Sequence, residues 1–213
     1  MPDLHALRLP LLDPARGTRL DLDAYEEDFW RRYTQIQGRD SWKLERGQHF
    51  VEQNSPSREA LARGDWEGAI RLLENRRESL RKEGEQDRRQ RTVFHRVRVV
   101  QRPFTPYIHW ELHSLRLNAE YGEAIRIVDA TRIAGPEESF GPLPELVVVG
   151  GRTLYQVIYT AEGVLDGGVR FTDPDLVQGW EGVIRAISED GEDLAPYFER
   201  AVAPLPPPRL TTE

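Results

Sequence analysis

The stretch from Thr92 to Ala130 reads TVFHRVRVVQRP, FTPYIHWELHSLRLNAEYG and EAIRIVDA, and it predicts a strand, a helix and a second strand. Val97 and Val99 occupy one side of the first strand, because successive side chains of a strand point to opposite faces. Arg96 and Arg98 occupy the other side. The first strand therefore has an apolar face and a basic face.

Capping residues mark both ends of the predicted helix. Thr105 offers a capping hydroxyl, and Pro106 has a backbone angle suited to the first helical turn. Gly122 closes the helix, and Ile125 and Ile127 then alternate along the second strand. A strand–helix–strand unit of this length predicts a parallel crossover whose helix packs on a sheet.

Further strands are expected after this unit. The apolar run 146–149 is followed by Gly150-Gly151 and by the alternating segment 153–159, which is typical of a hairpin. Residues 164–171 indicate an edge strand interrupted by two glycines, and Asp173-Pro174 begins another helix. We therefore predict an α/β fold, with a mixed sheet of about five to seven strands, packed helices and an N-terminal helical segment.

Three regions are expected along the chain. Residues 1–91 form a mainly helical N-terminal region, residues 92–203 an α/β domain, and residues 204–213 a Pro-rich tail. A long helix begins after Asp65 and keeps an apolar face as far as Leu80. Beyond it, RKEGEQDRRQR offers nothing apolar to bury, so we expect a break at Gly84 and a mobile segment.

Composition excludes several classes of site. The chain has no cysteine, which leaves no disulfide, thiol nucleophile or thiolate metal site. No apolar run approaches the roughly 20 residues that span a bilayer, so no membrane association is expected. The first residues lack the basic start and apolar core of a signal peptide, and we expect a cytoplasmic protein.

Charge is unevenly distributed along the chain. The net charge is −7, yet residues 71–102 hold eleven Lys and Arg against five Asp and Glu. Such a stretch is compatible with a solvated helix surface or with one nucleic-acid-binding face.

Two histidines stand four residues apart on the predicted helix. His109 and His113 therefore face the same way and could share a zinc ion. The metalloprotease pattern needs Glu directly after the first His, but Trp110 stands there, and no third ligand is evident from spacing. We expect no metal site here.

A candidate ligand site centres on the basic face of the first strand. A guanidinium can pair with buried carboxylates or capture an anion through planar, bidentate donors. The candidate ligand-binding residues are Arg96, Arg98, Tyr107, Glu111, Glu123 and Arg126. We expect at least one of the two strand arginines to pair with Glu111 or Glu123.

Catalytic and cofactor motifs are missing from the sequence. It contains no Walker pattern, no GxGxxG fingerprint and no Gly-x-Ser-x-Gly elbow. No catalytic residue and no cofactor are assigned, and the interpretation leans away from an enzyme.

Several segments together resemble an uncharacterised actinobacterial protein family of unknown function. They are WKLERGQHF with PSREALARGDWEGAIRLL, RVRVVQRPFTPYIHWEL with NAEYGEAIRIVDA, and LVVVGGRTLYQVIYTAEG with TDPDLVQGW and FERAV. Genes of that family often lie beside small helix-turn-helix regulators. The resemblance implies a regulatory or partner-binding role.

The order of elements near the C-terminus is also distantly similar to half of a phospholipase D-like domain. Catalytic members carry a His-x-Lys motif, but the two lysines here, Lys43 and Lys82, do not follow a His by two positions. The similarity therefore implies a binding or effector-sensing architecture without that activity.

Three functions remain open from the sequence. The first is a non-enzymatic cytoplasmic regulatory or adaptor protein that binds a partner such as a helix-turn-helix regulator. The second is an enzyme or binder of a small anionic ligand that uses the Arg/Glu/Tyr pocket. The third is nucleic-acid binding through residues 71–102.

Overall fold

The predicted crossover is present at the centre of the molecule. Strand β3 (Phe94–Val100) leads into helix α5 (Pro106–Glu120), which returns to strand β4 (Ala124–Asp129) parallel to β3. The Thr105 hydroxyl accepts the Ile108 N–H at 3.0 Å and caps α5, as expected. The strand–helix–strand prediction is therefore confirmed.

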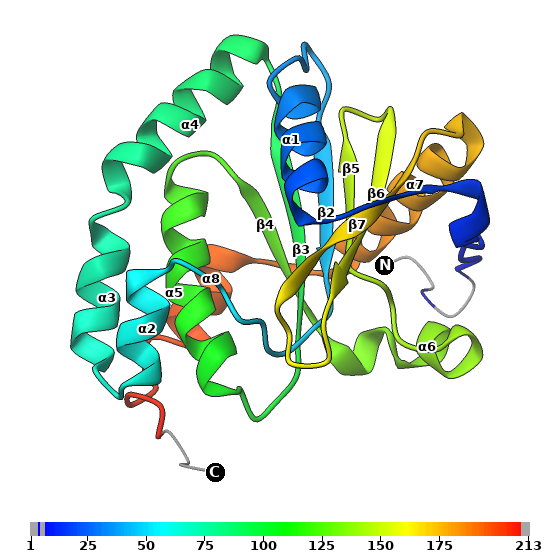
Figure 1. Ribbon diagram of the computed structural model, residues 1–213. Coiled ribbons are helices and arrows are strands. Elements are labelled where there is room, and N and C mark those ends of the chain that lie inside the picture. The colour runs from blue at the N-terminus through cyan, green and yellow to red at the C-terminus, as the bar shows by residue number, and fades with distance from the viewer. Residues whose placement is uncertain (1–3, 5–6, 210–213) are drawn as a thin grey trace.

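The computed structural model describes residues 4 and 7–209, and its strands form one mixed sheet in the order β1-β7-β6-β5-β2-β3-β4-β8 (Figure 1). The remaining strands are β1 (Thr18–Leu20), β2 (Ser41–Glu45), β5 (Leu146–Val149), β6 (Thr153–Tyr159), β7 (Leu165–Phe171) and β8 (Glu192–Asp193). The described part has eight strands, so the expected five to seven was too low. Strands β1 and β8 lie at the two edges of the sheet and are too short to show an alternating pattern.

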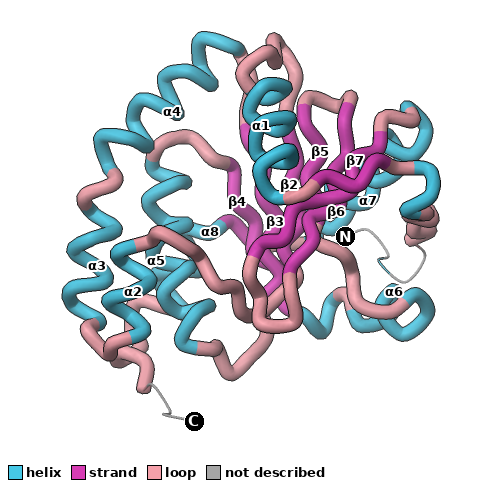
Figure 2. Tube along the Cα trace, viewed as in Figure 1, coloured by secondary structure: helices cyan, strands magenta, loops and turns pink. Residues whose placement is uncertain are grey.

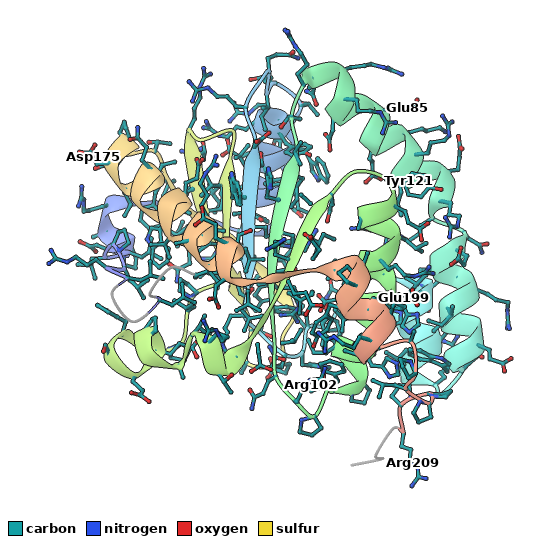
Figure 3. All side chains as sticks on the ribbon, turned by 180° about the vertical axis from the view of Figure 1, so that it is seen from behind. Glu85, Arg102, Tyr121, Asp175, Glu199 and Arg209 are labelled. Carbon is teal, nitrogen blue, oxygen red and sulfur yellow. The ribbon has the colours of Figure 1, made fainter. Side chains whose placement is uncertain are left out.

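Helices cover both faces of the sheet (Figure 2). Besides α5, they are α1 (Leu22–Tyr33), α2 (Pro56–Ala62), α3 (Trp66–Glu74), α4 (Arg77–Gln90), α6 (Ala134–Phe140), α7 (Pro174–Asp190) and α8 (Leu194–Ala201). Helix α7 crosses the back of the sheet, as the reverse view in Figure 3 shows. Helices α1 and α5 lie on the front, with α2, α3 and α4 outside α5 (Figure 1).

The core is divided between the two faces of the sheet. Behind it, Leu44, Val97 and Val99 are fully buried in the same apolar cluster as Trp180 and Ile184 of α7. In front, Ile125 and Ile127 pack with α5, and Val147 and Tyr155 pack with α1. Since Val97 and Val99 face α7, the arginines between and beside them face α1 and α5, as predicted.

A buried carboxylate fixes α1 to the sheet. Asp28 accepts the Tyr155 hydroxyl at 2.7 Å and Arg32 Nε at 2.9 Å, and it lies 3.1 Å from Arg170 Nη1. Burial opposes ionisation, but these hydrogen bonds hold the pKa of Asp28 well below its usual range. The charged form of Asp28 therefore anchors α1 above β6 and β7.

The β5–β6 hairpin is confirmed, with Gly150 and Gly151 both at positive φ in the turn. The strand expected at residues 164–171 is present as β7, but the prediction that it is an interrupted edge strand was wrong. Strand β7 is continuous through its glycines and pairs with β6 on one side and β1 on the other, so it is not an edge. Strand β1, which pairs with β7, lies about 150 residues earlier in the chain. No local sequence pattern predicts a pairing between such distant segments.

The predicted break at Gly84 does not occur, because α4 runs without interruption from Arg77 to Gln90. The expected long helix is divided in two: α3 ends at Glu74, and α4 starts at Arg77, after Asn75 and Arg76. A Cβ on Gly84 would lie 2.0 Å from the carbonyl oxygen of Tyr121, which follows α5 (Figure 3 labels Tyr121). Gly84 therefore allows α4 to dock closely on the end of α5, and docking keeps this polar segment helical.

Residues 204–209 of the Pro-rich tail form neither helix nor strand. The rest of the expected tail, residues 210–213, lies outside the described residues. The N-terminal region supplies more than helices, because β2 lies between β5 and β3 in the middle of the sheet.

Candidate functional site

Charged residues line the front of the two central strands. Strand β2 pairs in parallel with β3, which places Lys43 beside Arg96 and Glu45 beside Arg98. The residue between them, Leu44, points to the opposite face and packs in the α7 cluster. Four charged side chains thus form the floor between α1 and α5.

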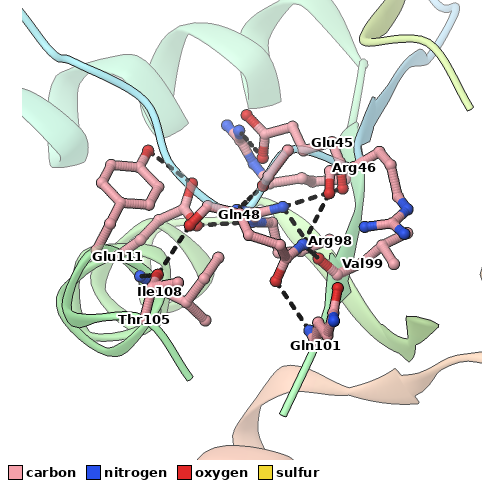
Figure 4. A network of polar contacts seen from close by, with 12 residues as sticks. Glu45, Arg46, Gln48, Arg98, Val99, Gln101, Thr105, Ile108 and Glu111 are labelled. Atoms are coloured by element: carbon pink, nitrogen blue, oxygen red, sulfur yellow. Dashed lines mark hydrogen bonds and ion pairs between the residues drawn. The ribbon is translucent and has the colours of Figure 1, made fainter. Parts of the chain in front are cut away.

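Arg98 is fully buried at the centre of this floor. Its Nε donates to Glu111 of α5 at 2.6 Å, and its Nη2 donates to the Gly47 carbonyl at 2.6 Å. Its Nη1 donates to the carbonyls of Glu45 and Val99 at 3.1 and 3.0 Å (Figure 4). The guanidinium therefore joins β3, the loop after β2, and α5.

The neighbouring arginine forms a second set of pairs. Arg96 Nη1 lies 2.8 Å from Glu45, and Arg96 Nε donates to Glu123 at 3.0 Å. Lys43 pairs with Glu45 at 2.6 Å. Although burial opposes ionisation of Glu45, the charges of Arg96, Lys43 and Arg98 hold its pKa well below the usual range.

Five of the six predicted ligand-binding residues come together around this floor. Arg96 and Arg98 pair with Glu123 and Glu111, so the predicted ion pairs are confirmed. The Tyr107 hydroxyl lies between two carboxylate acceptors for its single proton, Glu111 at 3.1 Å and Glu52 at 3.0 Å.

Arg126 lies apart from the other five. Ile125 and Ile127 of β4 face α5, and the alternation of the strand sends Arg126 to the opposite side. There Arg126 pairs with Asp193 at 2.6 Å and donates to the carbonyls of Ser188 and Gly191. It holds the edge strand β8 in place.

Two charged floor residues were missed by the sequence reasoning. Lys43 and Glu45 alternate with the apolar Trp42 and Leu44, a pattern typical of a strand with one polar face. Its polar members lie on the front face, where Glu45 pairs with Arg96 of β3 and with Lys43.

Two adjoining cavities lie over this floor. The first, which we call the aromatic cavity, has a volume of about 420 Å³ and lies between α1, α4 and α5. Its apolar walls include Tyr25, Phe29, Trp30, Tyr33, Leu80, Phe94, Tyr121, Val147 and Leu165. The second, the polar cavity, has a volume of about 560 Å³ and extends towards Glu52, Tyr107 and Glu111. Both touch Lys43 and Arg96, so they form one continuous cleft.

Three rings of α1 form a corner of the aromatic cavity. The ring of Trp30 stands nearly perpendicular to Phe29 and to Tyr33, with ring centres 5.2 and 5.9 Å apart. Phe29 and Tyr33 are stacked at 5.7 Å. Trp30 is 57% exposed, which is unusual for the largest apolar side chain. This corner offers ring faces to a ligand.

A carboxylate lies beside this corner. Asp87 of α4 is half-buried and accepts the Tyr33 hydroxyl at 3.0 Å. Among the described residues, no Lys, Arg or His forms an ion pair with it. Burial raises the pKa of Asp87, and the charges of Glu123 and Glu83 add to the shift, although the Tyr33 hydrogen bond opposes it.

The cleft as a whole is acidic. Eight carboxylate side chains line it, against three cationic ones and the buried Arg98 that pairs with Glu111, a formal surplus of four negative charges. The carboxylates are Asp23, Glu26, Glu45, Glu52, Glu83, Asp87, Glu111 and Glu123, and the cations are Lys43, Arg76 and Arg96.

The histidine pair of α5 packs against an aromatic ring. His109 and His113 have ring centres 5.6 Å apart, and Trp66 lies within 4.7 and 5.2 Å of them. Burial lowers the pKa of His113 to about 4, with His109 and Arg116 adding to the shift. Over residues 4 and 7–209, no group of three or more His, Cys, Asp or Glu side chains is placed to hold a metal ion.

Several residues of the basic stretch pair with carboxylates of α4 or of its neighbours α3 and α5. Arg81 pairs with Glu78 at 2.9 Å and also with Glu85, and Arg89 lies 3.6 Å from Glu85. Arg77 pairs with Glu74 and Glu120. These are (i, i+3) and (i, i+4) neighbours on a solvated surface, apart from Glu120 on α5.

Glu145, a carboxylate near the floor, has a raised pKa. Glu145 Oε1 accepts the backbone N–H groups of Arg46 and Gly47, while Oε2 is buried without a hydrogen-bond partner among the described residues. Burial, together with the charge of Glu45, raises the pKa of Glu145 from 4.5 to about 7.

Between pH 4.5 and about 7, Glu145 keeps its proton in the folded state but loses it in the unfolded state. We therefore expect its contribution to the free energy of unfolding to fall as the pH rises through this range. The free energy of unfolding, measured by urea denaturation at about pH 5 and about pH 8, should drop more for the wild type than for Glu145→Gln. The histidines titrate equally in both proteins and cancel in the comparison. Equal drops would show that Glu145 is ionised in the fold.

Among the described residues, no helix is long and apolar enough to cross a membrane.

Comparison with curated proteins finds no match, and comparison with solved structures finds none either. The model of a family described as a domain of unknown function, DUF6879, matches residues 27–199. That match spans the floor, the last seven residues of α1, and all of α4, α5 and α7, and the chain belongs to the DUF6879 family.

Proposed function

We propose that this protein is a non-enzymatic, cytoplasmic regulatory protein that binds a small molecule in the aromatic cavity. The main observation behind this proposal is the aromatic cavity. Its volume of about 420 Å³ lies within the range of about 300–1,000 Å³ typical of small-molecule sites. Its walls are mainly aromatic and aliphatic, with a few polar groups near Asp87 and Arg96, which is how such sites combine affinity with orientation.

The pairing of the floor residues favours binding over catalysis. Arg96 and Lys43 are held by Glu45 and Glu123, and Arg98 is held by Glu111 and three carbonyls. The same pairing weakens the case for an anionic ligand, because the guanidinium donors that would bind it are already engaged. The intrahelical pairs of α4 likewise weaken the case for nucleic-acid binding.

The regulatory part of the proposal rests on the resemblance to a family encoded beside helix-turn-helix regulators. The similarity to a phospholipase D-like domain without its His-x-Lys motif points the same way. The cavity walls come from separate helices, α1, α4 and α5. A ligand between them would favour one arrangement of α4 against α1, and so change the surface offered to a partner protein.

A ligand screen tests this function. We expect some members of a chemically diverse collection, containing cations, anions and neutral aromatic compounds, to raise the melting temperature of the wild type, because a ligand stabilises only the state that binds it. The same compounds should lose their effect on Trp30→Ala.

The control is Phe140→Ala on α6, which removes another exposed aromatic side chain, 59% accessible and outside the cleft. This variant should respond like the wild type. If no compound of any charge stabilises the protein in a Trp30-dependent way, the proposed function is wrong. Anionic hits that instead depend on Arg96 would favour the anionic-ligand alternative.

A further inference from the structure

We propose that the aromatic cavity binds an organic cation, in which a protonated amine is attached to an apolar body. The inference rests on the proposed function and specifies the chemical class of its ligand. The amine would lie between the α1 rings and Asp87, and the apolar body would extend along the aliphatic wall of Leu80, Val147 and Leu165.

The distribution of charge on α4 is the first argument. Leu80, Glu83, Gly84 and Asp87 follow one another at helical spacing, and all four line the cavity. No basic residue of the same helix lines the cavity, and several of them pair with carboxylates outside it, as Arg81 does with Glu78. The side of α4 that lines the cavity therefore carries two carboxylates, the half-buried Asp87 and the exposed Glu83, and no basic residue.

The missing counter-charge is the second argument. Glu123 is balanced by Arg96, and Glu45 by both Arg96 and Lys43. Within the part of the chain that the structure describes, Asp87 and Glu83 have no such cation. The Tyr33 hydroxyl satisfies Asp87 only in part, because a half-buried carboxylate without a cation is unfavourable, and a bound ammonium group would compensate it. An anion would increase the existing surplus of negative charge.

The arrangement of rings is the third argument. A cation within about 6 Å of an aromatic ring centre is attracted by the electron-rich ring face, most strongly for tryptophan. Trp30, Phe29 and Tyr33 present faces in two perpendicular directions. The Tyr33 hydroxyl donates to Asp87, so the carboxylate lies at the edge of this ring cluster.

Three probes of equal length test the proposal on the wild-type protein: 4-phenylbutylamine, 4-phenylbutanol and 4-phenylbutyrate. Isothermal titration should show that the amine binds at least about tenfold more tightly than the alcohol, with the carboxylate weakest. Asp87→Asn keeps the shape of the side chain but removes its charge. It should weaken amine binding by at least about tenfold and leave alcohol binding unchanged.

Glu78→Gln is the matched control, since it removes the same charge from the outer side of α4, where Glu78 is 61% exposed. It should bind the amine as the wild type does. Glu83→Gln provides a second cavity variant if Asp87→Asn proves unstable, and it should also weaken the amine selectively.

The outcomes separate this inference from the proposed function. Alcohol binding as tight as amine binding, or an amine affinity indifferent to both cavity variants, would overturn the cationic ligand while leaving a Trp30-dependent cavity in place. Absence of amine binding would overturn it as well. Loss of every Trp30-dependent ligand in the screen would instead remove the proposed function itself.

Discussion

Replacing Arg98 with alanine should lower the free energy of unfolding by about 3–5 kcal/mol. The side chain is fully buried, and its removal leaves the carboxylate of Glu111 in the interior without its cation. The carbonyls of Glu45, Gly47 and Val99 lose their donors at the same time. Urea denaturation followed by circular dichroism measures the loss, which is large against the total stability of an average domain.

Two further variants make the result interpretable. Arg200→Ala removes an exposed arginine paired with Glu192, and it should stay within about 1 kcal/mol of the wild type. The double variant Arg98→Met with Glu111→Leu should recover part of the loss, because it removes both buried charges instead of one. An Arg98→Ala protein as stable as the Arg200→Ala control would contradict a buried structural ion pair.

Replacing Gly84 with alanine should destabilise the protein by about 1–3 kcal/mol, although the same change inside most helices is stabilising. The new Cβ would lie 2.0 Å from the Tyr121 carbonyl oxygen and 3.2 Å from its carbon. A backbone carbonyl cannot rotate away as a side chain can, so α4 must move from the end of α5. Because α4 forms a wall of the aromatic cavity, ligand binding should weaken as well.

Gly182→Ala on α7 is the matched control for this change. Gly182 also lies within a helix, but a Cβ there would meet nothing within 4 Å. The variant should be more stable than the wild type by up to about 1 kcal/mol, the ordinary difference in helix propensity between the two residues. If Gly84→Ala is stabilising too, the close docking of α4 on α5 is absent.

Local chemistry was sufficient for much of the fold. The crossover from β3 through α5 to β4 was predictable because a capping threonine, a proline and two alternating strands all lie within one short stretch. The hairpin was predictable because Gly150 and Gly151 supply the positive φ angles of its turn. The two strand arginines could be placed on the face opposite Val97 and Val99 by alternation alone.

Some residues around those arginines could be predicted from the sequence, and others could not. Glu111 and Glu123 lie within about thirty residues of the strand, in the elements that the crossover brings back to the sheet, and they were expected. Glu45 and Lys43 were not, because they reach Arg96 only after β2 inserts next to β3. Strand order depends on long-range packing, which no local pattern encodes.

The sequence by itself therefore determined the α/β class, the central crossover and the polar face of β3, since neighbouring residues set caps, turns and alternation. Only the tertiary structure decided the cavity. Its walls come from α1, α4 and α5, which are separated in the chain and meet through the anchoring of Asp28 and the close approach at Gly84. The acidic face of α4 became a candidate ligand site only through that docking, because a helix surface acquires its function from what lies opposite it.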